Sequence, residues 1–178
     1  MKNVLVTYGS KFGSTAEIAE KIAEVLRTRG LNVSIMPAST VSNLTAFNAV
    51  VLGSAVYTGH WIKEAIDFLV SHEDSLSTRP VWFFSSGPTG QGDPVERLNG
   101  WRFPEAQLDI ADRIRPQGTV VFHGKMDIDK LNFGERLMIR AVGSPTGDFR
   151  DWAAITAWAE EIATTLLPLE MAVGRVES

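Results

Sequence analysis

Seven consecutive residues near the start of the chain combine glycines with hydroxyl side chains: Gly9-Ser10-Lys11-Phe12-Gly13-Ser14-Thr15. They lie between a short apolar segment and a segment with helical spacing. Glycines allow backbone amides to approach an anion closely, and a helix N-terminus adds free amides and a positive dipole end. The pattern predicts a loop that binds phosphate without a metal. It is equally compatible with an ordinary turn in which Ser14 and Thr15 cap the helix.

Two later segments, 54–61 and 85–92, are also rich in Gly, Ser and Thr. Each follows an apolar run that is typical of a buried strand. In a parallel sheet the ligand lies outside the carboxyl ends of the strands, at the switch point of the strand order. We therefore expect these two segments and residues 9–15 to form one ligand site. The three segments contain no acidic residue.

Other kinds of site fit the sequence less well. The Walker pattern and the G-x-G-x-x-G fingerprint are absent from the first turn, and residues 87–92 have their glycines in the reverse spacing. The chain contains no cysteine, and its histidines, His60, His72 and His123, do not have the i, i+4 spacing of a metal pair. We therefore expect no metal site, and no catalytic residue has a motif of its own.

The segments that position these loops alternate between strand and helix. The predicted strands are 3–8, 31–35, 48–53, 80–85 and 119–122, and the predicted helices are 14–29, 62–69, 105–115 and 152–166. Residues 31–35 alternate between apolar and polar, as in an edge strand, and residues 88–104 are predicted as a loop. This alternation predicts an α/β fold, with a single doubly wound parallel sheet of five strands covered by helices on both faces.

Length and composition indicate one domain in residues 1–168, followed by a loose tail at 169–178. The net charge of −4 argues against a nucleic-acid binder, because no basic excess is available to displace counterions from phosphates. The apolar run 4–6 is too short for a signal peptide, and no window reaches the roughly 18 apolar residues of a membrane span. We expect a cytoplasmic protein, with association with the inner face of the membrane left open, as is the oligomeric state.

From Tyr8 onward the chain resembles the flavodoxin signature, in which an aromatic residue is followed at fixed offsets by a hydroxyl residue, a small residue, Thr, Ala and an aliphatic residue. These positions are filled by Tyr8, Ser10, Gly13, Thr15, Ala19 and Ile22. Two positions depart from the pattern: Thr7 replaces an apolar or aromatic residue, and Phe12 replaces the second hydroxyl of the T-x-T-G-x-T core. The resemblance implies the flavodoxin-like strand order 2-1-3-4-5 and FMN as the cofactor.

The third-strand loop narrows the resemblance. The run from Gly53 to Trp61 fits G-[SA]-[SA]-x-x-x-G-H-[YW] and is similar to the flavodoxin-type, quinone-dependent protoporphyrinogen oxidases of bacteria. Residues 133–139 and 151–163 resemble later segments of that family. The likeness covers most of residues 2–166 and is strongest at 4–26 and 47–72. It implies an FMN-dependent oxidoreductase of heme biosynthesis that oxidises protoporphyrinogen IX and reduces menaquinone or another quinone.

The resemblance assigns the cofactor to the three loops. The implied FMN-binding residues are Ser10, Lys11, Phe12, Gly13, Ser14 and Thr15 for the phosphate, Ala55, Val56, Tyr57, Thr58, Gly59 and His60 on one side of the ring, and Ser86, Gly87, Pro88, Thr89 and Gly90 on the other.

Aromatic residues near these loops have two interpretations each. Tyr57 and Trp61 can stack on a flavin or a flat substrate, and Trp61 can instead pack in the core. His60 can hydrogen-bond the reduced flavin or act as a structural cap near a helix start. Trp101 and Phe103 are predicted to form a lid over the reactive ring, because loose aromatic loops commonly form such lids.

Residues 132–142 carry apolar side chains at helical spacing, with Arg136 and Arg140 between them. One interpretation is a helix that faces the core and exposes its arginines. The other is an amphipathic patch that meets a membrane or a quinone carrier.

Three functions remain open at this stage: the quinone-dependent oxidase, a flavodoxin that carries electrons between protein partners, and a module that has kept the fold and lost the cofactor. Carriers are usually acidic around the flavin, which the three loops are not. Phe12 favours the third function.

Overall fold

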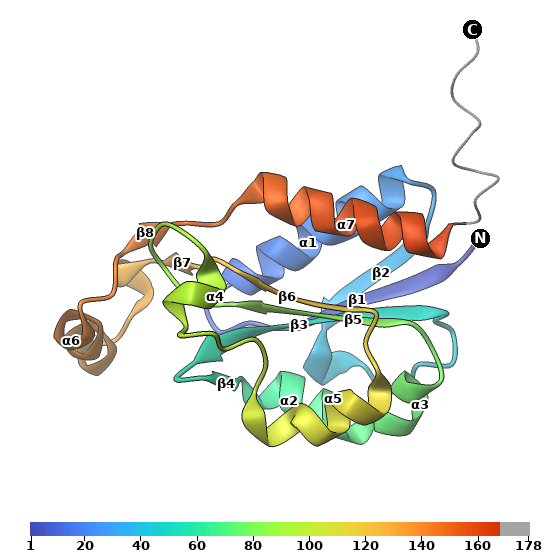
Figure 1. Cartoon of the computed structure of the whole chain (residues 1–178), viewed down its shortest axis with the longest axis horizontal. Helices are drawn as coiled ribbons and strands as arrows, with labels where there is room; N and C mark the ends of the chain where they lie inside the picture. The colour runs from blue at the N-terminus through green and yellow to red at the C-terminus, as the bar shows by residue number, and fades with distance from the viewer. Residues whose placement is uncertain (168–178) are drawn as a thin grey trace, which may run out of the picture.

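The computed structural model describes residues 1–167, and its centre is a sheet of five parallel strands (Figure 1). These strands are β1 (Asn3–Gly9), β2 (Asn32–Pro37), β3 (Ala49–Tyr57), β5 (Val81–Ser86) and β6 (Gly118–Phe122). Their order, β2-β1-β3-β5-β6, is 2-1-3-4-5 when the parallel strands are counted along the chain, so the predicted topology is confirmed. A two-residue strand, β4 (His60–Trp61), pairs antiparallel with the end of β3.

Helices cover both faces of the sheet (Figure 1). On one face lie α1 (Ser14–Thr28) and α7 (Trp152–Leu166); on the other lie α2 (Lys63–Ser71), α3 (Glu73–Ser77) and α5 (Leu108–Ile114). Short elements complete the connections: the 3-10 turns η1 (Ala38–Thr40), η2 (Glu105–Gln107) and η3 (Ile128–Lys130), and α4 (Pro94–Arg97). The predicted three-layer α/β arrangement is therefore the observed one.

The central strands β3 and β5 approach each other closely enough to require a glycine. A Cβ at Gly53 would lie 1.9 Å from Cζ of Phe84 on the neighbouring strand. Every residue of β5 is buried, as are the first seven of β3. These strands therefore form the rigid floor from which the loops at their carboxyl ends are held.

Residues 123–151, here called the β6–α7 insert, leave the sheet after its last strand and return at the start of α7. The insert contains the antiparallel strands β7 (Lys125–Met126) and β8 (Gly147–Asp148) and the helix α6 (Phe133–Val142). Its two ends meet where Phe149 N donates a hydrogen bond to Gly124 O at 3.1 Å. Figure 1 shows α6 set apart from the sheet and its covering helices.

Several local predictions need correction. The cap of α1 is Gly13, with no side-chain cap bond, so Ser14 and Thr15 do not cap the helix. The predicted helix at 105–115 begins as η2 and becomes α-helical only at Leu108. The predicted loop 88–104 contains α4, whose first turn is capped by Asp93.

The position of α6 contradicts the interpretation of residues 132–142 as a helix that faces the core. None of its residues is buried, so the interpretation as a core-facing helix is wrong. The predicted tail, residues 169–178, lies outside the described residues. In the part of the chain that the structure describes, no helix is long and apolar enough to cross a membrane.

Candidate functional site

The three predicted ligand loops lie side by side at the carboxyl edge of the sheet. The strand register pairs Gly9 with Ser54 and Ala55 with Ser86, so each loop leaves its strand at the same level. The second and third loops are in contact, since a Cβ at Gly87 would lie 3.1 Å from both Cβ and O of Val56. The sheet therefore assembles one site from segments that are far apart in the sequence.

The first loop is shaped by Gly13, which has a φ of +91° at the start of α1. This left-handed conformation favours glycine over any residue with a Cβ. Gly13 N donates to Ser10 Oγ at 3.0 Å, which closes the loop on itself. The first amides of α1 have no acceptor within the helix and remain available to an anion.

Two hydroxyl residues of the first turn are buried at this helix end. Thr15 is buried, and Ser14 Oγ is a buried side-chain oxygen without a hydrogen-bond partner in the described structure. A buried polar atom without a partner is costly unless a ligand supplies one. The left-handed glycine, the free helix amides and the Ser14 hydroxyl together fit a phosphate group such as that of FMN.

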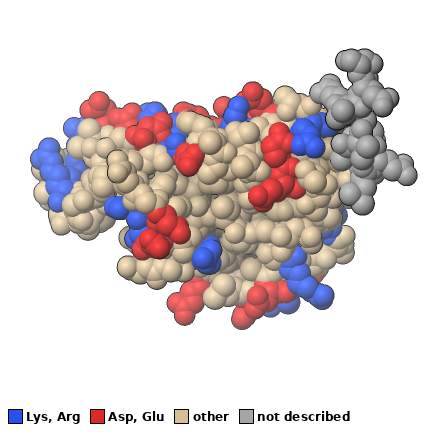
Figure 2. Space-filling model, turned by 45° about the horizontal axis from the view of Figure 1, so that its top comes forward, with Lys and Arg blue, Asp and Glu red and all other residues tan. Residues whose placement is uncertain are grey.

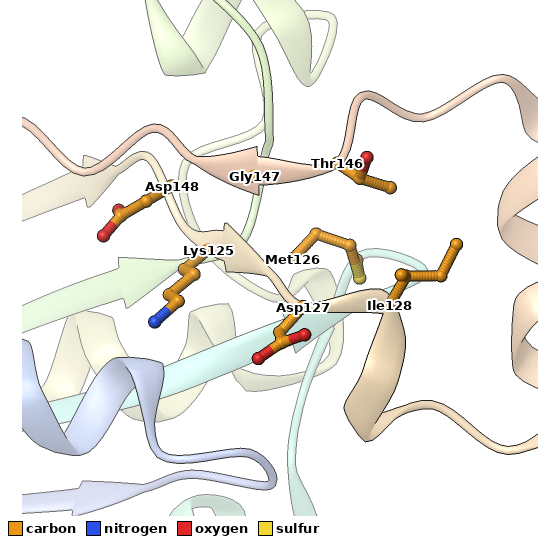
Figure 3. Close-up of a pocket in the computed structure, with 7 residues that line it drawn as sticks. All are labelled: Lys125, Met126, Asp127, Ile128, Thr146, Gly147 and Asp148. Carbon is orange, nitrogen blue, oxygen red and sulfur yellow. The ribbon is translucent and has the colours of Figure 1, made fainter.

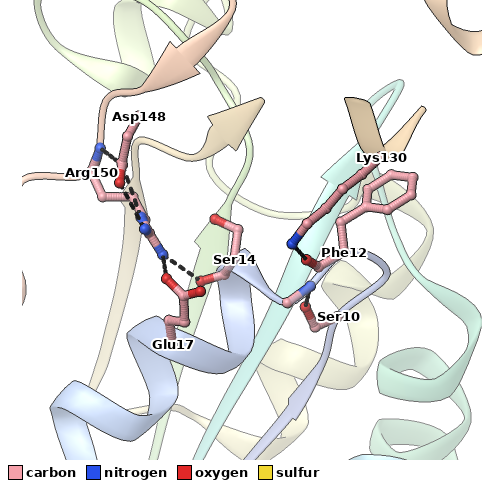
Figure 4. Close-up of polar contacts among 8 residues, drawn as sticks. Ser10, Phe12, Ser14, Glu17, Lys130, Asp148 and Arg150 are labelled. Carbon is pink, nitrogen blue, oxygen red and sulfur yellow. Dashed lines mark hydrogen bonds and ion pairs between the residues drawn. The ribbon is translucent and has the colours of Figure 1, made fainter. Parts of the chain in front are cut away.

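The β6–α7 insert reaches back to this loop with two cations (Figure 4). Lys130 Nζ donates to Phe12 O at 3.1 Å. Arg150, whose side chain is 3% exposed, contacts Ser14 O and forms ion pairs with Glu17 and Asp148. Phe12 thus lacks the usual hydroxyl, but its carbonyl is held by a positively charged side chain.

Hydrogen bonds and charge in this cluster shift its titration. The Arg150 guanidinium holds the pKa of Asp148 below its ordinary value, chiefly through their side-chain hydrogen bond. The same hydrogen bond to Asp148 raises the pKa of Arg150. Both groups are therefore charged at neutral pH. Residues 148–150 were not predicted as part of the site, because no spacing signal links them to α1.

The second loop is a tight hairpin turn between β3 and β4. Thr58 and Gly59 have φ values of +48° and +77° between the paired residues Tyr57 and His60, as in a type I′ turn. A β-branched residue is unusual at positive φ, and such strain is found most often at functional sites. Trp101 Nε1 donates to Gly59 O at 3.1 Å and fastens the turn to the following loop.

Tyr57 presents a half-exposed ring at this edge, and two charged side chains approach it. Lys11 Nζ lies 5.8 Å from the ring centroid, and Lys11 also forms an ion pair with Glu135 of α6. Burial and, to a lesser extent, the Glu135 carboxylate raise the pKa of Tyr57, so its hydroxyl stays protonated at neutral pH. The hydrogen bond from Lys11 lowers the pKa of Glu135.

Two of the predicted aromatic residues lie in the core. Trp61 is 3% exposed, and its Nε1 donates to Ser85 Oγ at 2.8 Å. Phe103 is buried and stacks on Phe83, with ring centroids 5.2 Å apart. Neither ring is accessible as a lid in this conformation, and the core interpretation of Trp61 is the one that the structure favours. Trp101 is half-buried and remains the predicted lid residue.

The third loop is held from behind by His123. Its two ring nitrogens lie 3.1 Å from Pro88 O and 2.6 Å from Gly92 O, and the side chain is buried. Gly90 has a φ of +114°, and the Arg97 guanidinium lies where its Cβ would be. His123 therefore positions residues 88–92. The sequence offered only a lone histidine after a strand, which does not reveal this role.

The remaining predicted residues fall into three groups by accessibility. Ala55, Ser86, Pro88, Thr89 and Gly90 are buried in the loop walls; Val56, Phe12 and Gly87 are half-buried; Lys11, Thr58 and His60 are exposed. The structure thus brings all three predicted loops to one edge, with His60 at its rim. The described residues contain no His, Cys, Asp and Glu cluster that could hold a metal.

A pocket of about 270 Å³ lies at the β7–β8 hairpin rather than on the three loops (Figure 3). Lys125 and Asp127 project from one side of the hairpin, and Met126 and Ile128 project from the other. The volume is below the roughly 300–1,000 Å³ of typical small-molecule sites. The loop edge is the candidate for a cofactor on other grounds, the free amides of α1 and the buried Ser14 hydroxyl without a partner.

Comparison with known proteins agrees with this architecture. The chain matches the flavodoxin domain family model over residues 5–152. No individual curated protein matches it. Among solved structures, a flavodoxin from the domain Archaea is 12% identical with a TM-score of 0.58, covering 92% of this chain and 97% of that one. The Streptococcus pneumoniae flavodoxin is 16% identical with a TM-score of 0.59, covering 92% and 99%.

A larger protein contains the same fold as one of its parts. Rubredoxin:oxygen oxidoreductase from Desulfovibrio gigas is 15% identical with a TM-score of 0.62, and the alignment covers 93% of this chain and 36% of that one. At these identities, structural likeness shows the fold alone.

Proposed function

The chain belongs to the flavodoxin domain family and FMN is its cofactor, and on this premise we propose that it is an FMN-dependent oxidoreductase acting on a flat, reduced, porphyrinogen-like substrate. A quinone or a similar acceptor takes the electrons, at the inner face of the membrane. With FMN as the cofactor, the interpretation as a module that has lost it no longer stands.

The observation that carries the proposal is the charge around the three loops. They contain no acidic residue, and the carboxylates that meet the first loop are paired: Glu135 with Lys11, and Glu17 and Asp148 with Arg150. An electron carrier that docks on cationic partners is expected to surround its flavin with unpaired acids. A site whose rim is neutral and aromatic, with Tyr57 and Trp101, is better suited to a flat apolar substrate.

The chain's own residues bind, orient and shield the reacting groups. Ser10, Ser14 and Thr15 hold the phosphate at the α1 N-terminus. The backbone of residues 55–60 and 86–90 lines the two sides of the ring, and Trp101 covers the rim next to the substrate. His60, exposed at the rim, would be placed to donate a hydrogen bond to the cofactor. When bound, FMN supplies two-electron redox chemistry.

Each turnover balances in two halves. The substrate loses two electrons and two protons, and the acceptor quinone gains two of each to become the quinol. The protein needs no metal and no nucleophile for these steps, which agrees with the polar groups that line the loops.

A visible absorption spectrum of the purified chain, before and after addition of FMN, tests cofactor binding first. The FMN-loaded protein is then mixed anaerobically with protoporphyrinogen IX, and a water-soluble quinone is added afterwards. We expect bleaching of the flavin band by the porphyrinogen and its recovery with the quinone. Bleaching only by a reduced protein partner would instead identify an electron carrier.

Ser14→Ala tests the phosphate site. Removal of a hydroxyl that binds a charged group should weaken FMN binding about tenfold or more. Ser71→Ala, an exposed serine at the end of α2, is the matched control and should leave FMN affinity unchanged. Equal affinities for the two variants would place the phosphate elsewhere.

A further inference from the structure

The helix α6 is oriented with its apolar side outward. Its large apolar side chains are the exposed ones: Phe133 is 84% exposed, Leu137 60%, Met138 62% and Val142 66%. The residues that turn toward the rest of the molecule are Glu135, Arg136 and Ile139, which are half-buried. Most surface helices of globular proteins show the opposite arrangement, with the apolar stripe facing the core.

Polar contacts hold α6 in this orientation. Asn132 and Glu135 form a reciprocal capping box at its first turn. Glu135 also pairs with Lys11, and Arg136 Nε donates to Leu131 O at 3.0 Å. The ion pair with Lys11 therefore joins the polar side of α6 to the phosphate loop, while the other two contacts are local to the insert, and the large apolar side chains of the opposite side are exposed.

The charge of this region differs from that of the whole chain. Residues 130–142 carry three cations, Lys130, Arg136 and Arg140, against one acid, Glu135, a net charge of +2, whereas the chain carries −4. Lys and Arg side chains gather at the end of the molecule that α6 forms (Figure 2). An apolar stripe with the exposed Arg140 beside it, in a region of net positive charge on an otherwise acidic protein, is complementary to an anionic, apolar surface.

We propose that α6 is an in-plane membrane anchor that lays Phe133, Leu137, Met138 and Val142 into the interface of an anionic lipid bilayer. The exposed Arg140 extends its stem along the apolar side and leaves its guanidinium group at the lipid phosphates. The anchor specifies which element makes the membrane contact of the proposed function. It rests on the proposed function only for the identity of the electron acceptor.

Docking by α6 would also orient the cofactor site. Glu135, on the inner side of α6, is joined to Lys11 of the phosphate loop, and Lys11 lies over the Tyr57 ring at the site's rim. Docking by α6 would therefore bring the rim close to the membrane surface. An acceptor dissolved in the lipid would reach the site without leaving the membrane.

Vesicle flotation with the FMN-loaded full chain tests the anchor directly. Vesicles of phosphatidylcholine alone are compared with vesicles that also contain phosphatidylglycerol. We expect binding to the anionic vesicles and at least tenfold weaker binding to the neutral ones. The double variant Leu137→Ser with Met138→Ser should lower binding to anionic vesicles at least tenfold, because it removes the centre of the apolar side.

Val70→Ser is the matched control, since Val70 is also an exposed apolar residue but lies on α2. It should leave vesicle binding unchanged. Arg140→Glu should weaken binding to anionic vesicles and change neutral-vesicle binding little.

Absence of wild-type binding to anionic vesicles, or equal binding of the wild type and the double variant, would overturn the proposal. So would a dimer in light scattering that the same double variant dissociates, which would make a second copy of the chain the occupant.

The outcome is separable from that of the redox reaction. Turnover with a water-soluble quinone should be unchanged in the double variant, because α6 is outside the cofactor loops. A chain that binds anionic vesicles but does not oxidise porphyrinogen would support the anchor and contradict the proposed function. A chain that oxidises porphyrinogen but does not bind anionic vesicles would support the proposed function and contradict the anchor.

Discussion

Helices α1 and α6 have the same kind of sequence and opposite surroundings. Both carry apolar residues four apart along one side: Ile18, Ile22 and Leu26 in α1, and Phe133 and Leu137 in α6. Those of α1 are fully buried under the sheet, and those of α6 are exposed. Periodicity shows that a helix has an apolar side, but it does not show what that side contacts.

The difference follows from how each helix is connected. Helix α1 joins two parallel strands, and a right-handed crossover of this kind returns the chain across the sheet face. Helix α6 lies between the antiparallel strands β7 and β8 of the insert, so it is not part of a crossover between parallel strands of the main sheet. Its polar side is joined to the phosphate loop by the Glu135–Lys11 ion pair instead.

The helix starts differ as well. Helix α1 begins at a left-handed Gly13 with no side-chain cap, whereas α6 begins with a complete capping box. The open end of α1 leaves its first amides for a ligand, whereas the capping box of α6 satisfies the amides of Asn132 and Glu135. One helix start is built for binding, and the other is built for stability.

Truncation of one apolar residue in each helix should give the largest contrast. Ile22→Ala should lower the free energy of unfolding by about 2–5 kcal/mol, because it leaves a cavity in a packed core. Leu137→Ala should change it by no more than about 0.5 kcal/mol, because the side chain is already in water. Urea denaturation measures both. Similar losses in the two variants would mean that α6 packs against the body.

Arg150→Met tests the link between the insert and α1. It removes the guanidinium that bridges Asp148 and Glu17 and contacts Ser14 O, at a cost of about 1–2 kcal/mol in unfolding free energy. FMN affinity should fall too, since Ser14 lies in the phosphate loop. Lys63→Met, which breaks the exposed pair with Asp67 on α2, is the control and should cost no more than about 0.5 kcal/mol.

Acidification should loosen α6 before α1. The folded-state pKa values of Glu135 and Asp148 lie below their ordinary values of 4.5 and 3.8. Their contribution is therefore complete above the ordinary values and is lost as the pH falls through the lowered ones. Hydrogen-exchange protection factors at pH 7 and near pH 3 should show α6 amides losing protection while α1 core amides keep theirs. Parallel losses along both helices would contradict this.

Phe12→Thr should give the smallest effect of these substitutions. It changes the phosphate loop in front of α1 and leaves α6 unaltered. It restores the hydroxyl of the flavodoxin signature at the phosphate loop and should strengthen FMN binding by a few-fold, up to about tenfold. The free energy of unfolding without FMN should change by no more than about 0.5 kcal/mol, since the position is on the surface of the loop. Fluorescence titration with FMN measures the affinity, and weaker binding would mean that the Phe12 ring itself contributes.

The parts of the molecule that sequence could predict are those that local pattern determines. The apolar runs at 48–53 and 80–85 predicted the buried central strands, and the spacing from Tyr8 to Ile22 predicted the loop and helix at the phosphate site. Each of these signals lies within a few residues of the structure that it describes. They therefore located the sheet and the edge where the loops meet, whereas the strand order came from the resemblance to flavodoxins.

Contacts between residues far apart in the sequence could not be predicted from local pattern. Arg150 and Lys130 meet the phosphate loop across more than half of the chain, and no periodicity links them to it. His123 positions residues 88–92 through its ring nitrogens, which a lone histidine in sequence does not reveal. The aromatic residues Trp61 and Phe103 could be read as core or lid, and only packing against Phe83 distinguished the two.

The hydrogen bond from Phe149 N to Gly124 O has a consequence for engineering. Because the two ends of the β6–α7 insert already lie side by side, the segment between β7 and β8 can be replaced by another sequence. A two-residue Asn-Gly turn joining Met126 to Gly147 would close the hairpin without moving β6 or α7. A different helix grafted at the same two points would send the same flavin domain to another surface.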